Sequence, residues 1–284
     1  MRGSSARSQQ TLLERVDTRV EDGADPEVLG DELFAVVEVL DAQPVLRRLL
    51  SDPASSEQAK RGMVNHLFGT GDKGLIRSLL SRDEGKVSGP TVELLGDAAA
   101  LRWHSTRDLP DALERAGITA YLASAERAGQ LDEVEDELFR FGRVVHGDPE
   151  LRAAVGNRSL PVSQRRDLVD ALLSGPALPA TVALARQAAV GRHGSFETTL
   201  EDTGELAAQR RDRLVATVTS AIELGEAERN RLAEALGRYY GRQLHVNVVV
   251  DPRLMGGLTV QVGDDVIDGS VSGRLEDARR RISG

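Results

Sequence analysis

The 284-residue chain has no cysteine, so neither disulfide bonds nor cysteine-ligated metal can hold it together. Aromatic residues make up only 3% of it, and a platform for stacking nucleic-acid bases is therefore not expected. Long apolar runs are missing too: no signal peptide or membrane span is readable, and we expect membrane association only through a partner. The net charge of −9 argues against nucleic acid as a ligand, because phosphate binding depends on clustered cations.

An internal repeat organises the part of the chain that is rich in Ala, Leu, Glu and Arg, a composition typical of helical proteins. Residues 31–34 (DELF) recur as residues 136–139, at an offset of 105. Pro44 matches Pro149 at the same offset, and the register holds without a gap from 31 to 68. A unit of this length can bury its own core, so the pattern indicates a duplicated domain rather than a short-period solenoid. Each copy is predicted to be a string of short helices with apolar stripes that pack against each other. They include a helix over 92–103 in the first copy and helices over 118–128 and 162–173 in the second.

The hydrophobic period changes after residue 213. Residues 214–221 and 244–250 read as strands around a helix over 226–240, and 258–267 reads as a hairpin. Gly256 and Gly257 predict a bulge or a close backbone approach. A closing helix is expected from Val271. The order of elements predicts a small α/β module.

The order of residues between 251 and 275 resembles the C-terminal signature of the delta subunit of F-type ATP synthases, the OSCP family. The matching residues are Asp251, Pro252, Leu254, Gly256, Gly257, Val262, Gly263, Asp264, Val266, Ile267, Asp268, Gly269, Ser270, Gly273, Arg274 and Leu275. The resemblance implies that a helical copy is the family's six-helix N-terminal domain. We therefore predict a mainly α fold with two tandem six-helix bundle-like repeats and a small α/β module. The predicted domains are 1–110, an extra N-terminal repeat; 111–212, the family's helical domain; and 213–284, the α/β module.

The resemblance implies a non-catalytic stator subunit, present once per complex. It would link the alpha subunits of the catalytic head to the b stalk, so that rotation is coupled to ATP synthesis at the cytoplasmic face of the cell membrane. The helical domain would grip an N-terminal helix of an alpha subunit between its first and fifth helices, and the α/β module would meet b. The residues carried over for this groove are Tyr121, Leu122, Ala125, Leu184, Ala185 and Ala188. The alternative interpretation makes each of them a core residue. The first copy has Val16 where the second has Tyr121, so the same partner surface is not implied there.

Chemical sites are not expected. Asp264, Asp265 and Asp268 suit turns and caps better than a metal site, and no cofactor is predicted. Residues 69–74 spell GxGxxG but follow a helix rather than a strand, which favours an interhelical loop. The histidines are dispersed in sequence, without a metal-binding motif.

Two other classes of function remain open from the sequence. One is a helical adaptor or regulator that binds proteins outside any synthase. The other is an enzyme with a cleft at a domain junction, although no nucleophile, base and orienting group come together in the sequence.

Overall fold

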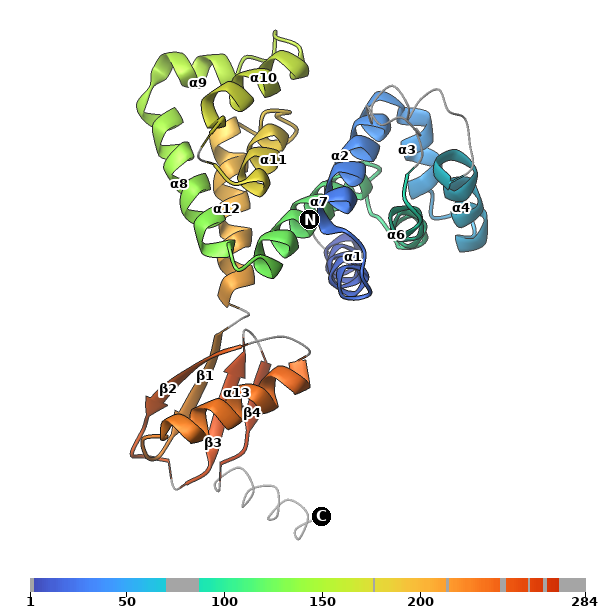
Figure 1. The fold of residues 1–284 in the computed structure, drawn as a ribbon. Coiled ribbons are helices and arrows are strands. Elements are labelled where there is room, and N and C mark those ends of the chain that lie inside the picture. The colour runs from blue at the N-terminus through green and yellow to red at the C-terminus, as the bar shows by residue number, and fades with distance from the viewer. Residues whose placement is uncertain are drawn as a thin grey trace. The chain divides into compact units, whose positions relative to one another are not determined.

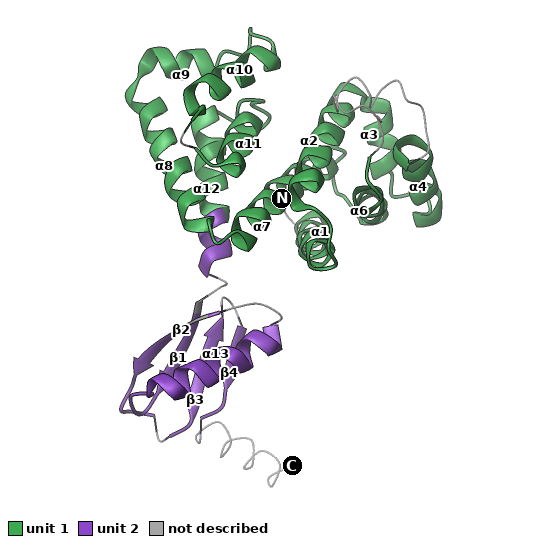
Figure 2. Ribbon diagram, viewed as in Figure 1, with its two compact units in different colours: residues 1–206 green, residues 207–284 purple. Residues whose placement is uncertain are grey.

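The computed structural model describes residues 3–69, 87–175, 177–212, 215–240, 244–254, 256–262 and 265–270. It divides by internal contacts into unit 1, residues 1–206, and unit 2, residues 207–284 (Figure 2). Unit 1 is helical, and unit 2 contains the sheet (Figure 1). The predicted mainly α fold with a small α/β module near the C-terminus is confirmed. The predicted domain boundaries after residues 110 and 212 stay predictions.

The secondary-structure elements described in unit 1 are helices, and prolines mark several of their starts. They are α1 (Ser4–Glu21), α2 (Pro26–Ala42), α3 (Pro44–Ser51), α4 (Glu57–Val64) followed by the π-helical turn η1 (Asn65–Gly69), α6 (Gly89–Ala100), α7 (Asp108–Arg127), α8 (Leu131–Gly147), α9 (Pro149–Val155), α10 (Val162–Leu173), α11 (Pro179–Ala188) and α12 (Phe196–Asp212), which continues into unit 2. Asp25 and Asp148 directly precede the prolines that open α2 and α9. Each accepts hydrogen bonds from two backbone N–H groups in the first turn of its helix. A cap of this kind contributes about 0.5–2 kcal/mol.

The two copies correspond helix by helix. The starts of α8, α9 and α10 lie 105 residues after those of α2, α3 and α4 (131, 149 and 162 against 26, 44 and 57). Glu32 accepts a hydrogen bond from Thr91 Oγ1 (2.6 Å) in the first turn of α6, and Glu137 accepts one from Thr181 Oγ1 (2.5 Å) in the first turn of α11. Each glutamate also accepts the backbone N–H three residues before that threonine. Thus α6 corresponds to α11, at an offset of 90 (91 to 181), and the first copy is 15 residues longer before this helix.

Helix α7 has a place in both copies. As the first helix of the second copy it corresponds to α1 (4 to 108, 21 to 127). As the last helix of the first copy it corresponds to α12, because the buried residues of the two helices share one spacing: Leu109, Leu113, Ala116 and Ala120 in α7, and Phe196, Leu200, Thr203 and Ala207 in α12. It packs along α1 and α2 and also against α8 and α11 (Figure 1). We call residues 4–127 the first bundle and residues 108–212 the second bundle, with α7 in both.

The predicted apolar stripes form the core of the first bundle. Leu12 and Val16 of α1, Leu33 and Val37 of α2, and Leu113 of α7 belong to one cluster and are at most 1% exposed. Fully burying such a side chain contributes about 1.5–3 kcal/mol. The core of the first bundle therefore depends on residues beyond 110.

Unit 2 contains the predicted strands and helix. They are β1 (Val215–Ser220), α13 (Glu226–Tyr240), β2 (His245–Val250), β3 (Leu258–Val262) and β4 (Asp265–Asp268). The sheet order is β2-β1-β3-β4, with β2 parallel to β1 and the other pairs antiparallel. Val218 lies opposite both Val248 and Val260, and Val218 and Val260 are buried with Leu236 of α13. The helix thus covers the apolar face of the sheet.

Several expectations differ from the structure or fall outside it. The helix expected over 92–103 is α6, which ends at Ala100, and Trp103 beyond it donates from Nε1 to Ala98 O (2.8 Å). The helix expected from 118 begins already at Asp108 as α7. Residues 70–74 of the GxGxxG segment and the closing helix from Val271 lie outside the described residues.

Candidate partner-binding site

Tyr121 lies on the face of α7 that meets α2. Its ring stacks on Phe34, with the centroids 5.9 Å apart, and covers Gly30, where an added Cβ would come within 2.6 Å of the ring. The hydroxyl donates a hydrogen bond to Asp31. Burial and this carboxylate raise the pKa of Tyr121, so the hydroxyl stays protonated as a donor. Tyr121 therefore anchors α7 to α2, the helix that carries the first DELF motif.

The other predicted groove residues are also buried. Leu122 and Ala125 on α7, and Leu184, Ala185 and Ala188 on α11, are at most 3% exposed. The two helices pack against each other. The structure thus places the predicted residues on two neighbouring helices. Their burial is what the alternative interpretation as core residues expects. Their binding of a partner helix stays a prediction.

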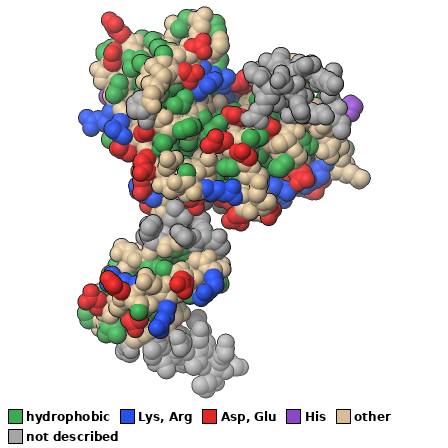
Figure 3. Space-filling view, in the orientation of Figure 1, with side chains coloured by type: hydrophobic (Ala, Val, Ile, Leu, Met, Phe, Trp, Pro, Cys, Tyr) green, Lys and Arg blue, Asp and Glu red, His purple; other side chains and the backbone are tan. Residues whose placement is uncertain are grey.

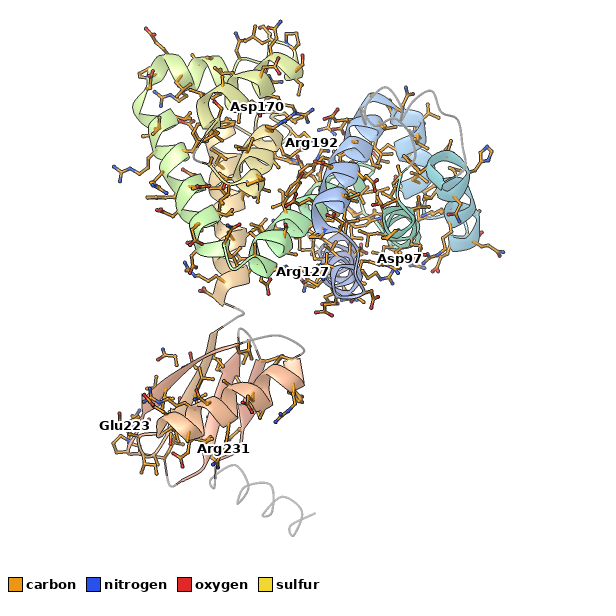
Figure 4. All side chains as sticks on the ribbon, viewed as in Figure 1. Asp97, Arg127, Asp170, Arg192, Glu223 and Arg231 are labelled. Atoms are coloured by element: carbon orange, nitrogen blue, oxygen red, sulfur yellow. The ribbon has the colours of Figure 1, made fainter. Side chains whose placement is uncertain are left out.

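A charged cluster around Arg192 joins the two bundles. Arg192 follows α11 and is labelled in Figure 4 on the side of the second bundle that faces α2. Its guanidinium reaches Glu114 Oε2 (2.6 Å) and Asp111 Oδ1 (3.0 Å) on α7 and Asp41 Oδ2 (2.5 Å) on α2, and its side chain is only 9% exposed. The second oxygen of Glu114 accepts from Gln187 Nε2 (2.6 Å). Arg192 and Glu114 are the buried pair of this set, and removing one partner of such a pair costs about 3–5 kcal/mol, because the remaining charge loses its partner.

A second ion pair, between Arg166 of α10 and Glu38 of α2, also joins the two bundles. Its partners are 21% and 27% exposed. The contact between bundles therefore combines the aromatic pair of Phe34 on α2 and Tyr121 on α7 with charged groups from α2, α7, α10 and the segment after α11. Elsewhere on the visible face, acidic and basic side chains are interspersed (Figure 3).

His193 completes the charged cluster. Its Nε2 lies 3.2 Å from both Asp111 Oδ1 and Glu114 Oε2, and these contacts raise the pKa of His193 to about 9. Burial alone would raise the pKa values of Asp111 and Glu114, but hydrogen bonding to His193 and the charge of Arg192 hold both below their ordinary values. Sequence reasoning missed this cluster, because its histidine and carboxylates are far apart along the chain.

Comparison with known proteins decides the family. The family model of the ATP synthase delta (OSCP) subunit matches residues 119–282. The protein named ATP synthase subunit delta from Streptomyces avermitilis is 44% identical over 283 residues, which cover 99% of this chain and 98% of that protein. The protein of the same name from Kineococcus radiotolerans is 45% identical over 284 residues, 100% of this chain and 96% of that protein. The chain belongs to the ATP synthase delta (OSCP) family.

Family membership confirms the resemblance read from the sequence. As a delta subunit of the F-type ATP synthase, the protein is a non-catalytic component of the peripheral stalk. The family match begins at residue 119, inside α7, whereas the two delta subunits above also align with the first bundle. Among the described helices, none is long and apolar enough to cross a membrane.

The glycines of the delta signature permit a close backbone approach in unit 2. Gly257 has a φ of +83°, and an added Cβ would come within 2.5 Å of Gly269 O. Gly269 in turn donates its N–H to Leu258 O (2.9 Å) at the start of β3. Only glycine fits position 257 without strain. The predicted close approach is confirmed.

The rest of the delta signature has structural roles where it is described. Asp268 Oδ1 accepts the N–H of Ser270 (2.8 Å), which is the turn role expected for this aspartate. Gly256 also has a positive φ, of +122°. Within the described residues, no group of three or more histidines and carboxylates could hold a metal ion. Gly263, Asp264, Arg274 and Leu275 lie outside the described residues.

Proposed function

We propose that this delta subunit ties the catalytic head to the b stalk, so that the head stays fixed while the rotor turns and rotation is coupled to ATP synthesis. The observation that carries the proposal is the similarity to proteins named ATP synthase subunit delta over 98–99% of both chains. The division into a helical unit and an α/β unit supports it, because a connecting subunit needs two separate surfaces. Joining two moderate contacts in one chain gives a long-lived attachment through effective concentration.

Unit 1 is the part that binds the head. The proposal assigns it the N-terminal helices of the alpha subunits, gripped by α7 and α11 through helix-in-groove packing. Ala125, Ala185 and Ala188 support this assignment, since small side chains allow helices to approach closely. Unit 2 is assigned to the end of b. The subunit is present once per complex and sits at the cytoplasmic face of the membrane, held there only by its partners.

Co-purification from solubilised membranes tests the proposal. A tagged chain should recover both alpha and b subunits, and intact-complex mass spectrometry should give one copy per complex. Recovery of neither subunit would favour the alternative of a helical adaptor that works outside the synthase.

A variant of α11 tests the groove itself. Ala185→Leu adds bulk at a fully buried position between the proposed gripping helices, whereas Ala183→Leu on the same helix adds it at a partly exposed one. We expect Ala185→Leu to lose alpha subunits about tenfold while keeping b, and Ala183→Leu to keep both, with circular dichroism used to verify folding. Equal recovery of alpha by the two variants would contradict the groove assignment.

A further inference from the structure

The second bundle contains a cavity lined by two arginines that have no part in the proposed stator role. Its volume is about 280 Å³, and its lining includes Arg158, Arg165, Gly191, Gly194 and Ser195. It lies where α10, the end of α11 and the start of α12 meet. Cavities that hold drug-sized ligands measure about 300–1,000 Å³, so this one lies just below that range and has room for a small ligand.

Arg165 is a buried cation with an unused donor. The residue is 5% exposed, and its Nη1 donates to Ala189 O (2.5 Å) at the end of α11. Its Nε is buried and has no hydrogen-bond partner among the described residues. A buried donor without a partner is costly, and native structures usually satisfy such groups with a ligand, ion or water.

Arg158 meets Arg165 at the cavity. Its Nη2 donates to Gly194 O (2.7 Å). A Cβ added at Gly191 would lie 3.3 Å from Arg165 Nη1 and 3.9 Å from Arg158 Nε, so the two guanidinium groups converge there. No carboxylate in the described part of the chain forms an ion pair with either arginine. Burial, and then the charges of Arg158 and Arg166, lower the pKa of Arg165, which indicates positive charge that is not compensated.

The N-terminal end of α12 adds to this positive field. The helix has 17 residues, and Ser195 lies directly before it and accepts the N–H of Thr198 (3.1 Å). The first turn of a helix exposes N–H groups and carries a partial positive charge, which favours anions.

We propose that this cavity binds a small oxyanion of the phosphate type between Arg158 and Arg165, at the N-terminus of α12. A divalent oxyanion offers acceptors for N–H groups of both guanidinium groups. The site belongs to the second bundle alone: at the repeat offset of 105, Arg165 corresponds to the buried Lys60, but Arg158 corresponds to Pro53. The proposal does not depend on the partners assigned to the stator, although Ala188 of the proposed groove also lines the cavity.

Titration of the full chain with inorganic phosphate tests the site, with sodium chloride at matched ionic strength as the reference. We expect saturable binding by calorimetry and, in amide NMR spectra, shifts concentrated at Gly191, Gly194 and Ser195. Arg158→Gln should weaken binding at least tenfold, because it removes a charge-assisted contact. Arg140→Gln, which neutralises an exposed arginine on α8, should leave binding unchanged.

Two further arms define the ligand. Glycerol phosphate should bind about as well as phosphate, and ATP no better. Absence of saturable phosphate binding, equal affinity in Arg158→Gln and wild type, amide shifts outside the cavity, or tighter binding of ATP would each overturn the proposal. The wild-type amide shifts locate the site even if Arg158→Gln proves unstable.

Discussion

Two phenylalanines at equivalent positions of the DELF motifs have opposite environments. Phe34 is 8% exposed and Phe139 is 63% exposed. Phe34 is covered by Tyr121 of α7, whereas Phe139 lies under the guanidinium of Arg143, 6.0 Å from the ring centroid. The glutamates of the same motifs, Glu32 and Glu137, keep one role. The motifs lie on α2 and α8. The difference between the copies therefore comes from what these two helices pack against, not from the motif itself.

The pKa of His193 predicts a pH dependence of stability. The pKa of His193 in the folded protein, about 9, lies above the ordinary 6.5. Its contribution to the free energy of unfolding is therefore complete below about pH 6.5 and is lost as the pH rises through 9. The lowered pKa values of Asp111 and Glu114 act in the opposite direction: their contribution is present above the ordinary carboxyl range and is lost as the pH falls below it.

Urea unfolding at about pH 6 and about pH 9.5 measures the histidine contribution. Between these pH values we expect the free energy of unfolding of wild type to fall by about 1 kcal/mol more than that of His193→Gln. This figure is smaller than the full pKa shift would give, because the His193 side chain is 48% exposed. His66→Gln, at an exposed position in η1, should behave as wild type. The same loss in His193→Gln and wild type would show that another group controls this range.

At the scale of elements, the contact between α2 and α7 depends on two glycines. An added Cβ at Gly117 would come within 2.6 Å of the Phe34 ring and 3.3 Å of Gly30 O, so the stacked rings and the backbones would have to separate. The corresponding residue of α12 is Gly204, where an added Cβ would have no neighbour within 4 Å.

Gly117 and Gly204 give a matched pair of variants. Gly117→Ala should lower the free energy of unfolding by about 1–3 kcal/mol, since overpacking outweighs the gain in helix propensity. Gly204→Ala should raise it by about 0.5–1 kcal/mol, since only the propensity changes. Thermal or urea unfolding measures both. A stabilised Gly117→Ala would mean that α2 and α7 are not in close contact.

Elements with local start and stop signals could be predicted from the sequence, but the start of α7 could not. The prolines that open α2, α3 and α9 are read directly, and α10 and α13 lie where the hydrophobic period places them. Helix α7 packs on two sides and is interrupted by Asp111 and Glu114, so it lacks a single apolar stripe. A second offset was nevertheless readable: Thr91 and Thr181 are 90 residues apart, not 105. The groove residues could be named by family resemblance but not located, because their burial depends on contacts between bundles.

At the scale of the whole molecule, removal of the first copy should damage the second. Deleting residues 1–105 leaves Leu109, Leu113, Ala116 and Ala120 of α7 without α1 and α2, which now cover them. We expect the truncated chain to bind the dye ANS and to have a lower midpoint of thermal unfolding than the full chain. Lys or Glu substitutions at Leu109 and Leu113 in the truncated chain should restore solubility. A truncated chain as stable as the full one would show that the second bundle does not depend on this packing, and its affinity for the isolated head would then measure what the first copy adds.

The shared helix also bears on how the subunit carries load. Its 20 residues correspond to a rod about 30 Å long that is built into both bundles. Where a flexible linker joins duplicated domains, a force on one domain first extends the linker. Here the helix α7 connects the two bundles in place of a linker, and bending it would strain both cores at once. The duplication has therefore lengthened the helical part of the chain without making it more compliant.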